Sequence, residues 1–221
     1  MLTFDDGHVS NYEHAWPILQ EFGVNAVFFI STNLIGKSGY LDWDQIKELD
    51  ANGFNIGSHG VNHIPLTNLP DAELAKELGE SKKMLEDRLG KTVGSFSVPR
   101  GFYNARVRRA AESAGYRFIC TSRFGLNSLH PDPLALARMA VKADTSEHEF
   151  TNWINGDLGL KGILENVKDF ARGTFPPKWY ETAASLRARR AKQSQSGFEI
   201  ASATLGTLPR NDDEKITRRI K

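Results

Sequence analysis

The sequence predicts an α/β fold, either an open parallel sheet or a (β/α) barrel. Short apolar runs alternate with segments of helical periodicity, and the connections between them are short. Groups of reactive polar residues follow directly after several of the predicted strands. Because α/β barrels build their active sites at the carboxyl ends of the strands, this placement supports the same fold class.

The first half of the chain is predicted to hold three strands, at 2–4, 26–30 and 54–57. The second of them is a continuous apolar run, typical of a strand covered on both faces. Two helices separate the strands. The second helix covers 42–49, with Asp42 as its cap. The first begins after Ser10 and carries apolar residues at helical spacing, namely Tyr12, Trp16, Leu19 and Phe22.

The second half of the chain continues the alternation and ends in a polar segment. A long helix is predicted over 71–89, with Gly90 as its stop. The remaining predicted elements are, in order, a strand at 93–98, a helix at 104–114, strands at 118–121 and 135–141, and helices at 147–153, 160–170 and 178–192. We therefore expect one domain over 1–192 and a polar, disordered tail over 193–221.

Composition argues against several classes of protein. The 221 residues carry 28 basic and 27 acidic side chains, a net charge of +1, so no global field favours nucleic acid or an acidic membrane. No apolar stretch approaches the ~18–20 residues that span a membrane. The single cysteine, Cys120, rules out an internal disulfide and a multi-cysteine metal site. Its apolar neighbours predict a buried, unreactive thiol.

The strongest chemical signal lies in the first seven residues. Asp5 and Asp6 follow a short strand, and two adjacent buried carboxylates repel each other unless a cation neutralises one of them. No lysine or arginine precedes Lys37, but His59 and His63 follow a later strand with three residues between them. Two histidines and one aspartate form a ligand set typical of hydrolytic metal sites, which keep positions open for water.

Three motifs occur in order within residues 1–145. They are Thr3-Phe4-Asp5-Asp6-Gly7, then Ser58-His59 with His63, and then Phe96-Ser97-Val98-Pro99-Arg100-Gly101. Together they resemble the polysaccharide deacetylase family, the NodB-homology or carbohydrate esterase family 4 domain. The resemblance implies a distorted, incomplete (β/α) barrel. Because only a few residues precede Asp5, we expect that part of the N-terminal region is missing.

The resemblance also implies a role for each polar residue of the first two motifs. Asp6, His59 and His63 correspond to the ligands of a divalent metal, with zinc expected and cobalt, nickel or iron suited to the same ligands. Asp5 corresponds to the general base that accepts a proton from metal-bound water. In a structural alternative, the aspartates cap a turn and the histidines lie on a solvated loop.

The third motif departs from the family pattern Phe-Arg-Pro-Pro-Tyr-Gly. Ser97 stands in place of the arginine that orients the base, so Asp5 must be held by another residue. Arg100 stands in place of the tyrosine whose backbone N–H donates to the oxyanion, and a main-chain donor does not depend on the side chain. A structural turn is the alternative for this motif. The residues expected to bind substrate are Pro99, Gly101 and Tyr103, the last by stacking on a sugar ring.

The sequence contains no evident acid to protonate the departing amine. Family members usually take it from a late Leu-x-His motif, and the corresponding stretch 134–141 contains Arg138 but no histidine. Relatives that deacetylate biofilm poly-N-acetylglucosamine carry this histidine upstream of the first motif. Within the chain, His130 is a weak candidate on a loop, and His8 is expected beside the site in a supporting role. His14 and His148 are predicted to be exposed on helices.

These observations predict a metal-dependent N-deacetylase that acts on an acetylated amino-sugar polysaccharide. Two alternatives stay open: a C–N hydrolase of small amides, and a non-catalytic glycan-binding protein. Nucleic acid and a membrane span are not expected. The expected location is cytoplasmic if Met1 is the true start, and extracytoplasmic if an N-terminal segment is missing.

Overall fold

A computed structural model describes residues 1–159, 162, 164 and 167. The chain divides into two compact units, Met1–Pro177 and Lys178–Lys221, and all described residues belong to the first. The helix predicted over 178–192, the tail predicted over 193–221 and most of the helix predicted over 160–170 lie outside the described residues. The domain boundary predicted after residue 192 therefore stays a prediction.

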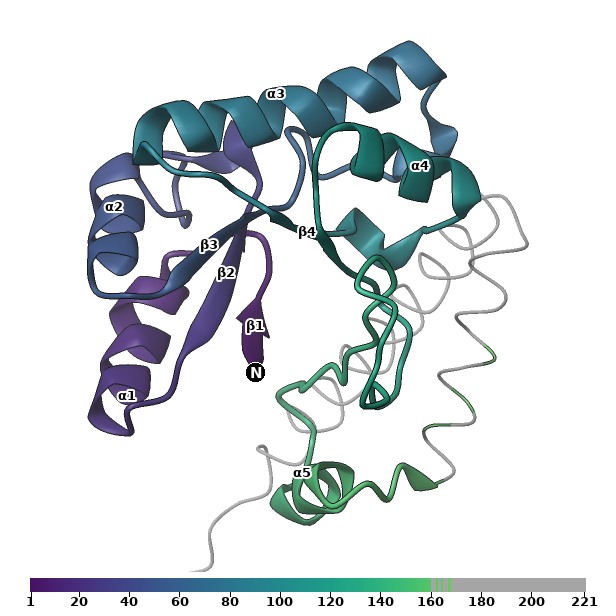
Figure 1. Cartoon of the computed structure of the whole chain (residues 1–221). Coiled ribbons are helices and arrows are strands. Elements are labelled where there is room, and N and C mark those ends of the chain that lie inside the picture. The colour runs from purple at the N-terminus through teal and green to yellow at the C-terminus, as the bar shows by residue number, and fades with distance from the viewer. Residues whose placement is uncertain (160–161, 163, 165–166, 168–221) are drawn as a thin grey trace, which may run out of the picture. The chain divides into compact units, whose positions relative to one another are not determined.

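Five parallel strands form one sheet in the order β1-β2-β3-β4-β5 (Figure 1). Each strand pairs with its neighbour in sequence, so that Thr3 lies opposite Val27 and Phe28 lies opposite Ile56. The sheet curls into half of a barrel, which confirms the predicted distorted, incomplete (β/α) barrel. The strands are β1 (Leu2–Phe4), β2 (Ala26–Ile30), β3 (Asn55–Ser58), β4 (Ser95–Ser97) and β5 (Phe118–Cys120).

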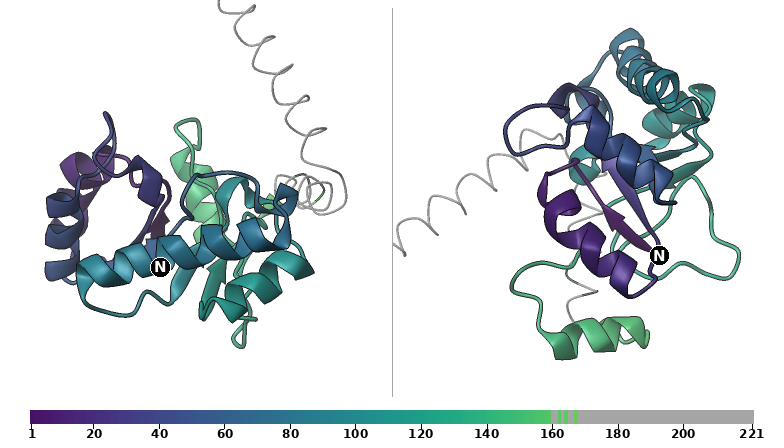
Figure 2. Two further views of the ribbon diagram at one scale, coloured as in Figure 1. Left: turned by 90° about the horizontal axis from the view of Figure 1, so that it is seen from above. Right: turned by 90° about the vertical axis from the view of Figure 1, so that its left-hand side faces the viewer.

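The helices between consecutive strands pack on the outside of the curled sheet, as the two further views in Figure 2 show. Asp42 caps α2 in a capping box with Gln45, and the side chain of Asn104 caps α4, so both helices begin where the sequence predicts. The helices are a π-helical turn (Asn11–Ala15), α1 (Trp16–Glu21), α2 (Trp43–Ala51), α3 (Asp71–Leu89), α4 (Ala105–Ser113) and α5 (Glu147–Ile154).

The long helix α3 contacts both β3 and α4, and it has the predicted bounds. Its buried stripe includes the leucines at 74, 78 and 85, which pack into the two core clusters between the helices and the sheet. Two polar residues, Glu77 and Ser81, lie on the same stripe and are also buried. Because buried polar groups must find hydrogen-bond partners, these two residues link α3 to the strand and loop beneath it.

Two sequence predictions about local structure are wrong. Phe22 does not join the buried face of the first helix; its side chain is 71% exposed, because the π-helical turn changes the spacing and Phe22 follows the last helical residue. The strand predicted over 135–141 is reduced to a single bridge between Leu136 and Cys120. The ladder stops there because the side chain of Arg138 donates to the carbonyl of Thr121. The backbone N–H of Arg138 donates instead to the carbonyl of Arg123.

No helix in the described part of the chain combines the length and the apolar character needed to cross a bilayer.

The thiol of Cys120 is expected to resist alkylation in the folded protein. It lies on β5 in a small buried cluster with Val27 and Phe29, and burial raises its pKa, which lowers the fraction of reactive thiolate. We expect native protein to react with a thiol reagent at least ~10-fold more slowly than protein unfolded in denaturant at the same pH. Equal rates in the two states would contradict the buried position.

Candidate metal and catalytic site

Three side chains from two strand ends converge at the carboxyl edge of the sheet. Asp6 follows β1, His59 follows β3, and His63 lies one loop further on. The Oδ1 atom of Asp6 is 3.2 Å from Nε2 of His59 and 3.1 Å from Nε2 of His63. One ligand atom from each residue lies within 4.8 Å of the others. Tetrahedral zinc with bonds of ~2.1 Å places its ligands ~3.4 Å apart, so this spacing fits one shared ion.

The surroundings of Asp6 favour a cation. Its Oδ1 atom is shielded from solvent and accepts no hydrogen bond from any described residue. The interactions with His59 and then His63 outweigh burial and lower the pKa of Asp6, so the carboxylate is ionised. The Nδ1–H of His59 donates to the carbonyl of Ser97 at 2.8 Å, which turns Nε2 toward Asp6. An ionised oxygen facing two ring nitrogens fits a divalent metal.

Asp5 is held by Arg138, a residue that the sequence motifs do not predict for this role. The guanidinium donates to both carboxylate oxygens, from Nη1 to Oδ1 at 2.8 Å and from Nη2 to Oδ2 at 2.9 Å. The hydroxyl of Ser97 donates to Oδ2 of Asp5 at 3.0 Å and lies 2.9 Å from Nη2 of Arg138. Burial alone would raise the pKa of Asp5, but Arg138, His59 and Ser97 together lower it. Asp5 is therefore an ionised carboxylate beside the three candidate metal ligands.

Arg138 joins elements from both edges of the open sheet. Its Nη1 also donates to the hydroxyl of Thr3 in β1 at 3.1 Å, and its Nε donates to the carbonyl of Thr121 after β5 at 3.1 Å. The available signal in the sequence is a lone arginine in the apolar stretch 134–141, together with the need for a group to hold Asp5. The family pattern predicts a histidine in that stretch, so it gives no role to an arginine there.

Three non-glycine residues have a positive φ in the described part of the chain, and all three are predicted site residues. They are Asp6 (φ 73°), His63 (φ 53°) and Arg100 (φ 57°). This conformation is costly for residues with a side chain, and such strain persists where the surrounding structure enforces it, most often at functional sites. A positive φ thus marks two of the three predicted metal ligands and the predicted oxyanion residue.

The turn of the third motif packs against the histidine loop. Pro99, Arg100 and Gly101 form a short 3-10 turn after β4, in which Pro99 is buried and Arg100 is exposed. A Cβ on Gly60 would lie 3.7 Å from the ring of Pro99, so the two motifs are in contact. The hydroxyl of Tyr103 donates to the carbonyl of Leu134, and its ring packs on a core cluster. Substrate contacts by Pro99, Gly101 and Tyr103 stay predictions.

Gly101→Ala is expected to destabilise the protein by about 2 kcal/mol. The new Cβ would lie 2.3 Å from the hydroxyl oxygen of Ser122, at a φ of +74°. Gly36→Ala is the matched control, since Gly36 has a φ of +75° but no atom within 4 Å of the place that its new methyl group would occupy. Thermal unfolding should show the larger loss for Gly101→Ala, and equal losses would mean that Ser122 does not set the requirement for glycine.

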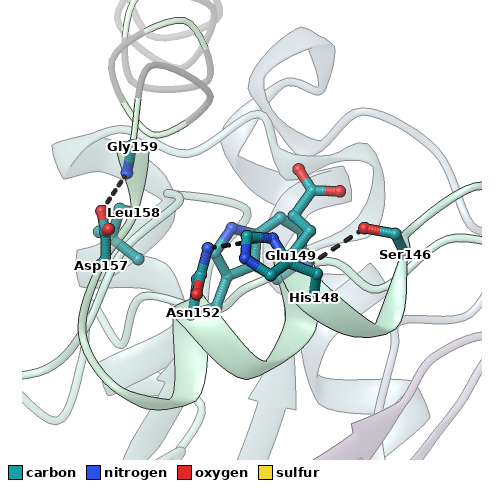
Figure 3. A pocket seen from close by; sticks show the side chains of 8 residues that line it. Ser146, His148, Glu149, Asn152, Asp157, Leu158 and Gly159 are labelled. Carbon is teal, nitrogen blue, oxygen red and sulfur yellow. Dashed lines mark hydrogen bonds between the residues drawn. The ribbon is translucent and has the colours of Figure 1, made fainter.

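None of the other described histidines contacts the two aspartates through a hydrogen bond or ion pair. His8 is exposed and its Nδ1 lies 2.9 Å from the hydroxyl of Ser10, while His14 and His130 are exposed. His148 is exposed on α5, where it lines a pocket of about 320 Å³ with its neighbour Asn152 (Figure 3). That pocket contains none of the predicted site residues.

Comparisons with known proteins identify relatives of this chain. The family profile described as polysaccharide deacetylase matches residues 1–119. The protein YxkH of Bacillus subtilis is 32% identical over 154 residues, which cover 70% of this chain and 55% of that protein. The peptidoglycan-N-acetylglucosamine deacetylase of Bacillus cereus is 29% identical over 160 residues, 72% of this chain and 70% of that enzyme. The chain thus spans little more than half the length of the first relative.

A solved structure has the same fold. The Streptococcus pyogenes deacetylase PplD, determined in complex with acetate, superposes with a TM-score of 0.65 at 27% identity, and the match covers 68% of each chain. The superposition agrees with the half-barrel described above. With the family profile covering more than half of its residues, the chain belongs to the polysaccharide deacetylase family.

Proposed function

We propose that this protein is a metal-dependent hydrolase that removes N-acetyl groups from an amino-sugar polysaccharide. The observation that carries the proposal is the Asp6, His59 and His63 cluster beside Asp5, a carboxylate that Arg138 keeps ionised. The relatives named above support the substrate class. Because the chain covers only part of YxkH, the choice between peptidoglycan, chitin-like and poly-N-acetylglucosamine chains is left to the experiment below.

The metal would be held by Oδ1 of Asp6 and by Nε2 of His59 and His63. When bound, a divalent cation supplies Lewis acidity to the acetamide carbonyl and lowers the pKa of nearby water. Zinc is proposed because it prefers nitrogen and oxygen ligands in tetrahedral sites, and cobalt, nickel and iron suit the same set.

The chain's own residues would perform the remaining steps. Asp5 accepts a proton from water as the water oxygen bonds to the carbonyl carbon. The backbone N–H of Arg100 donates to the oxygen that becomes negative, at a position fixed by the strained turn. The C–N bond then breaks as the amine takes up a proton from an acid outside this chain or from solvent, acetate leaves, and Asp5 returns its proton to solvent. Arg138 and Ser97 orient Asp5 and keep it ionised before the reaction, so that it can act as a base.

Acetate release distinguishes this proposal from its alternatives. Protein loaded with zinc should release acetate from acetylated chitooligosaccharides, from poly-N-acetylglucosamine or from peptidoglycan, and a chelator should stop the reaction. Hydrolysis of small amides without release from oligosaccharides would favour a small-amide hydrolase. Metal and glycan binding without any acetate would favour a glycan-binding protein, an alternative that gains support because no further described histidine contacts the aspartates.

A further inference from the structure

The loop that carries the second and third proposed metal ligands is fixed from outside by α3. Residues 59–63 leave the end of β3, and both Gly60 (φ 77°) and His63 (φ 53°) have left-handed backbone conformations. In this conformation both imidazoles are directed toward Asp6. Contacts that hold the loop in it before an ion binds would reduce the cost of ordering the site.

Glu77 provides the main contacts to this loop. Its Oε1 accepts from the backbone N–H of Asn62 at 2.5 Å, and its Oε2 accepts from the side-chain amide of Asn62 at 2.9 Å. The Oε1 atom also lies 3.2 Å from the position that a Cβ on Gly60 would occupy. Glu77 is 5% exposed, and no ion pair joins it to a described lysine or arginine. The two N–H donors of Asn62 converge on Glu77, and a carboxylate can accept both because it has two acceptor oxygens.

The opposite side of the loop is held by the segment after β2. The side-chain amide of Asn33 donates to Oδ1 of Asn62 at 3.0 Å, and the backbone N–H groups of Thr32 and Asn33 donate to the carbonyls of Gly60 and Val61. Asn62 is thus held between Asn33 and Glu77, and it directly precedes the ligand His63. Neither Asn33 nor Glu77 belongs to the three sequence motifs.

We propose that Glu77 is a positioning residue for the metal site, which acts through Asn62 to hold the loop in its ion-binding conformation. This inference rests on the proposed metal site. Outer-shell partners of metal ligands typically contribute ~10–100-fold to metal affinity, because they fix the orientation of the ligands before the ion arrives.

The test is the dissociation constant for zinc, measured by competition with a chromogenic chelator, together with thermal unfolding of the metal-free protein. Glu77→Gln keeps the shape of the side chain but replaces one acceptor oxygen with an NH₂ donor. One of the two N–H donors of Asn62 would then face another donor. We expect its zinc affinity to fall ~10-fold or more. The matched control is Glu80→Gln on the exposed face of the same helix, which should bind zinc like the parent protein.

A second pair of variants separates positioning from general destabilisation. Asn62→Ala removes one of the two hydrogen bonds to Glu77 at an exposed residue, so it should fold and still weaken zinc binding. Leu85→Val disturbs the buried face of α3 away from the loop, and it should lower the unfolding temperature without changing zinc affinity.

Zinc affinities of Glu77→Gln and Asn62→Ala within twofold of the parent value would overturn the inference. So would an equal loss of affinity in Leu85→Val, because that result would trace the effect to stability. If the parent protein itself binds no divalent metal, the proposed function fails as well. Deacetylase activity of the zinc-saturated variants gives an independent readout of the proposed function, because saturation compensates for weaker binding.

Discussion

Asp6→Gly is expected to abolish specific binding of one divalent metal and to lower kcat for deacetylation by at least ~10³-fold. The reason is that the loss of a direct ligand should exceed the ~10–100-fold effect of an outer-shell partner. The metal-free protein should nonetheless stay within ~1 kcal/mol of the parent in stability. Glycine adopts the φ of 73° without strain, which offsets the loss of the contacts from Asp6 to His59 and His63.

This combination separates a metal ligand from a structural turn residue. If Asp6 served only to cap a turn, Asp6→Gly would lower the unfolding temperature and leave metal binding unchanged. Metal content by mass spectrometry and unfolding followed by circular dichroism decide between the two outcomes. His14→Ala is the control, because His14 is exposed and lies outside the cluster. It should change neither quantity.

Arg138→Met is expected to lower kcat by ~10²-fold or more and to destabilise the protein by about 3 kcal/mol. Methionine fills part of the space but leaves the carboxylate of Asp5 without its two strongest donors. Breaking a fully buried ion pair costs ~3–5 kcal/mol of stability. We expect the lower value here because the Asp5 side chain is 31% exposed. Activity assays under metal saturation and denaturant unfolding measure the two effects.

The pH dependence gives a further check on Arg138. In the parent protein the pKa of Asp5 is lowered, so the stability from its ionised form is present above the unfolded value of 3.8 and is lost as pH falls through the lower folded value. Without Arg138, burial dominates and should raise the pKa of Asp5. The acid limb of kcat/KM should therefore move to higher pH in Arg138→Met, and an unchanged limb would contradict the assigned role.

Moving the arginine from position 138 to position 97 tests whether Asp5 needs only a nearby guanidinium or needs one from that particular segment. Ser97 occupies the position at which the family pattern has arginine, and its hydroxyl already contacts both Asp5 and Arg138. We expect the double variant Ser97→Arg/Arg138→Ser to recover part of the activity lost in Arg138→Met. Arg108→Met is the control, because its forked pair with Asp132 is more exposed and should contribute little to stability or activity.

The fold was largely predictable because its signals are local. The continuous apolar run over 26–30 and the capped, periodic helix over 71–89 have the predicted bounds. The strand predicted over 135–141 failed because its hydrogen bonds depend on a distant partner. Once the guanidinium of Arg138 turns inward to Asp5, it takes the carbonyl of Thr121 that the ladder needs. Apolar content alone could not reveal that competition.

Only those residues of the candidate site that lie within a short sequence motif could be predicted. The Asp5-Asp6 pair and the two histidines carry their spacing in the sequence, and the structure brings Asp6, His59 and His63 together. Arg138 and Glu77 reach the site from distant segments, and each contact depends on how the sheet curls. The weak signals were a charged residue in an apolar stretch and a glutamate on the buried stripe of a helix.

The wide separation of Arg138 from Asp5 has a consequence for how the protein matures during synthesis. All three proposed metal ligands lie within the first 63 residues, whereas Arg138 follows His63 by 75 residues. At ribosomal rates of ~5–20 residues per second, that interval is ~4–15 s. The ligands, and Glu77 that holds their loop, are therefore synthesised before the arginine that orients Asp5, so the ion-binding residues and the residue that prepares the base enter the folding protein at different times.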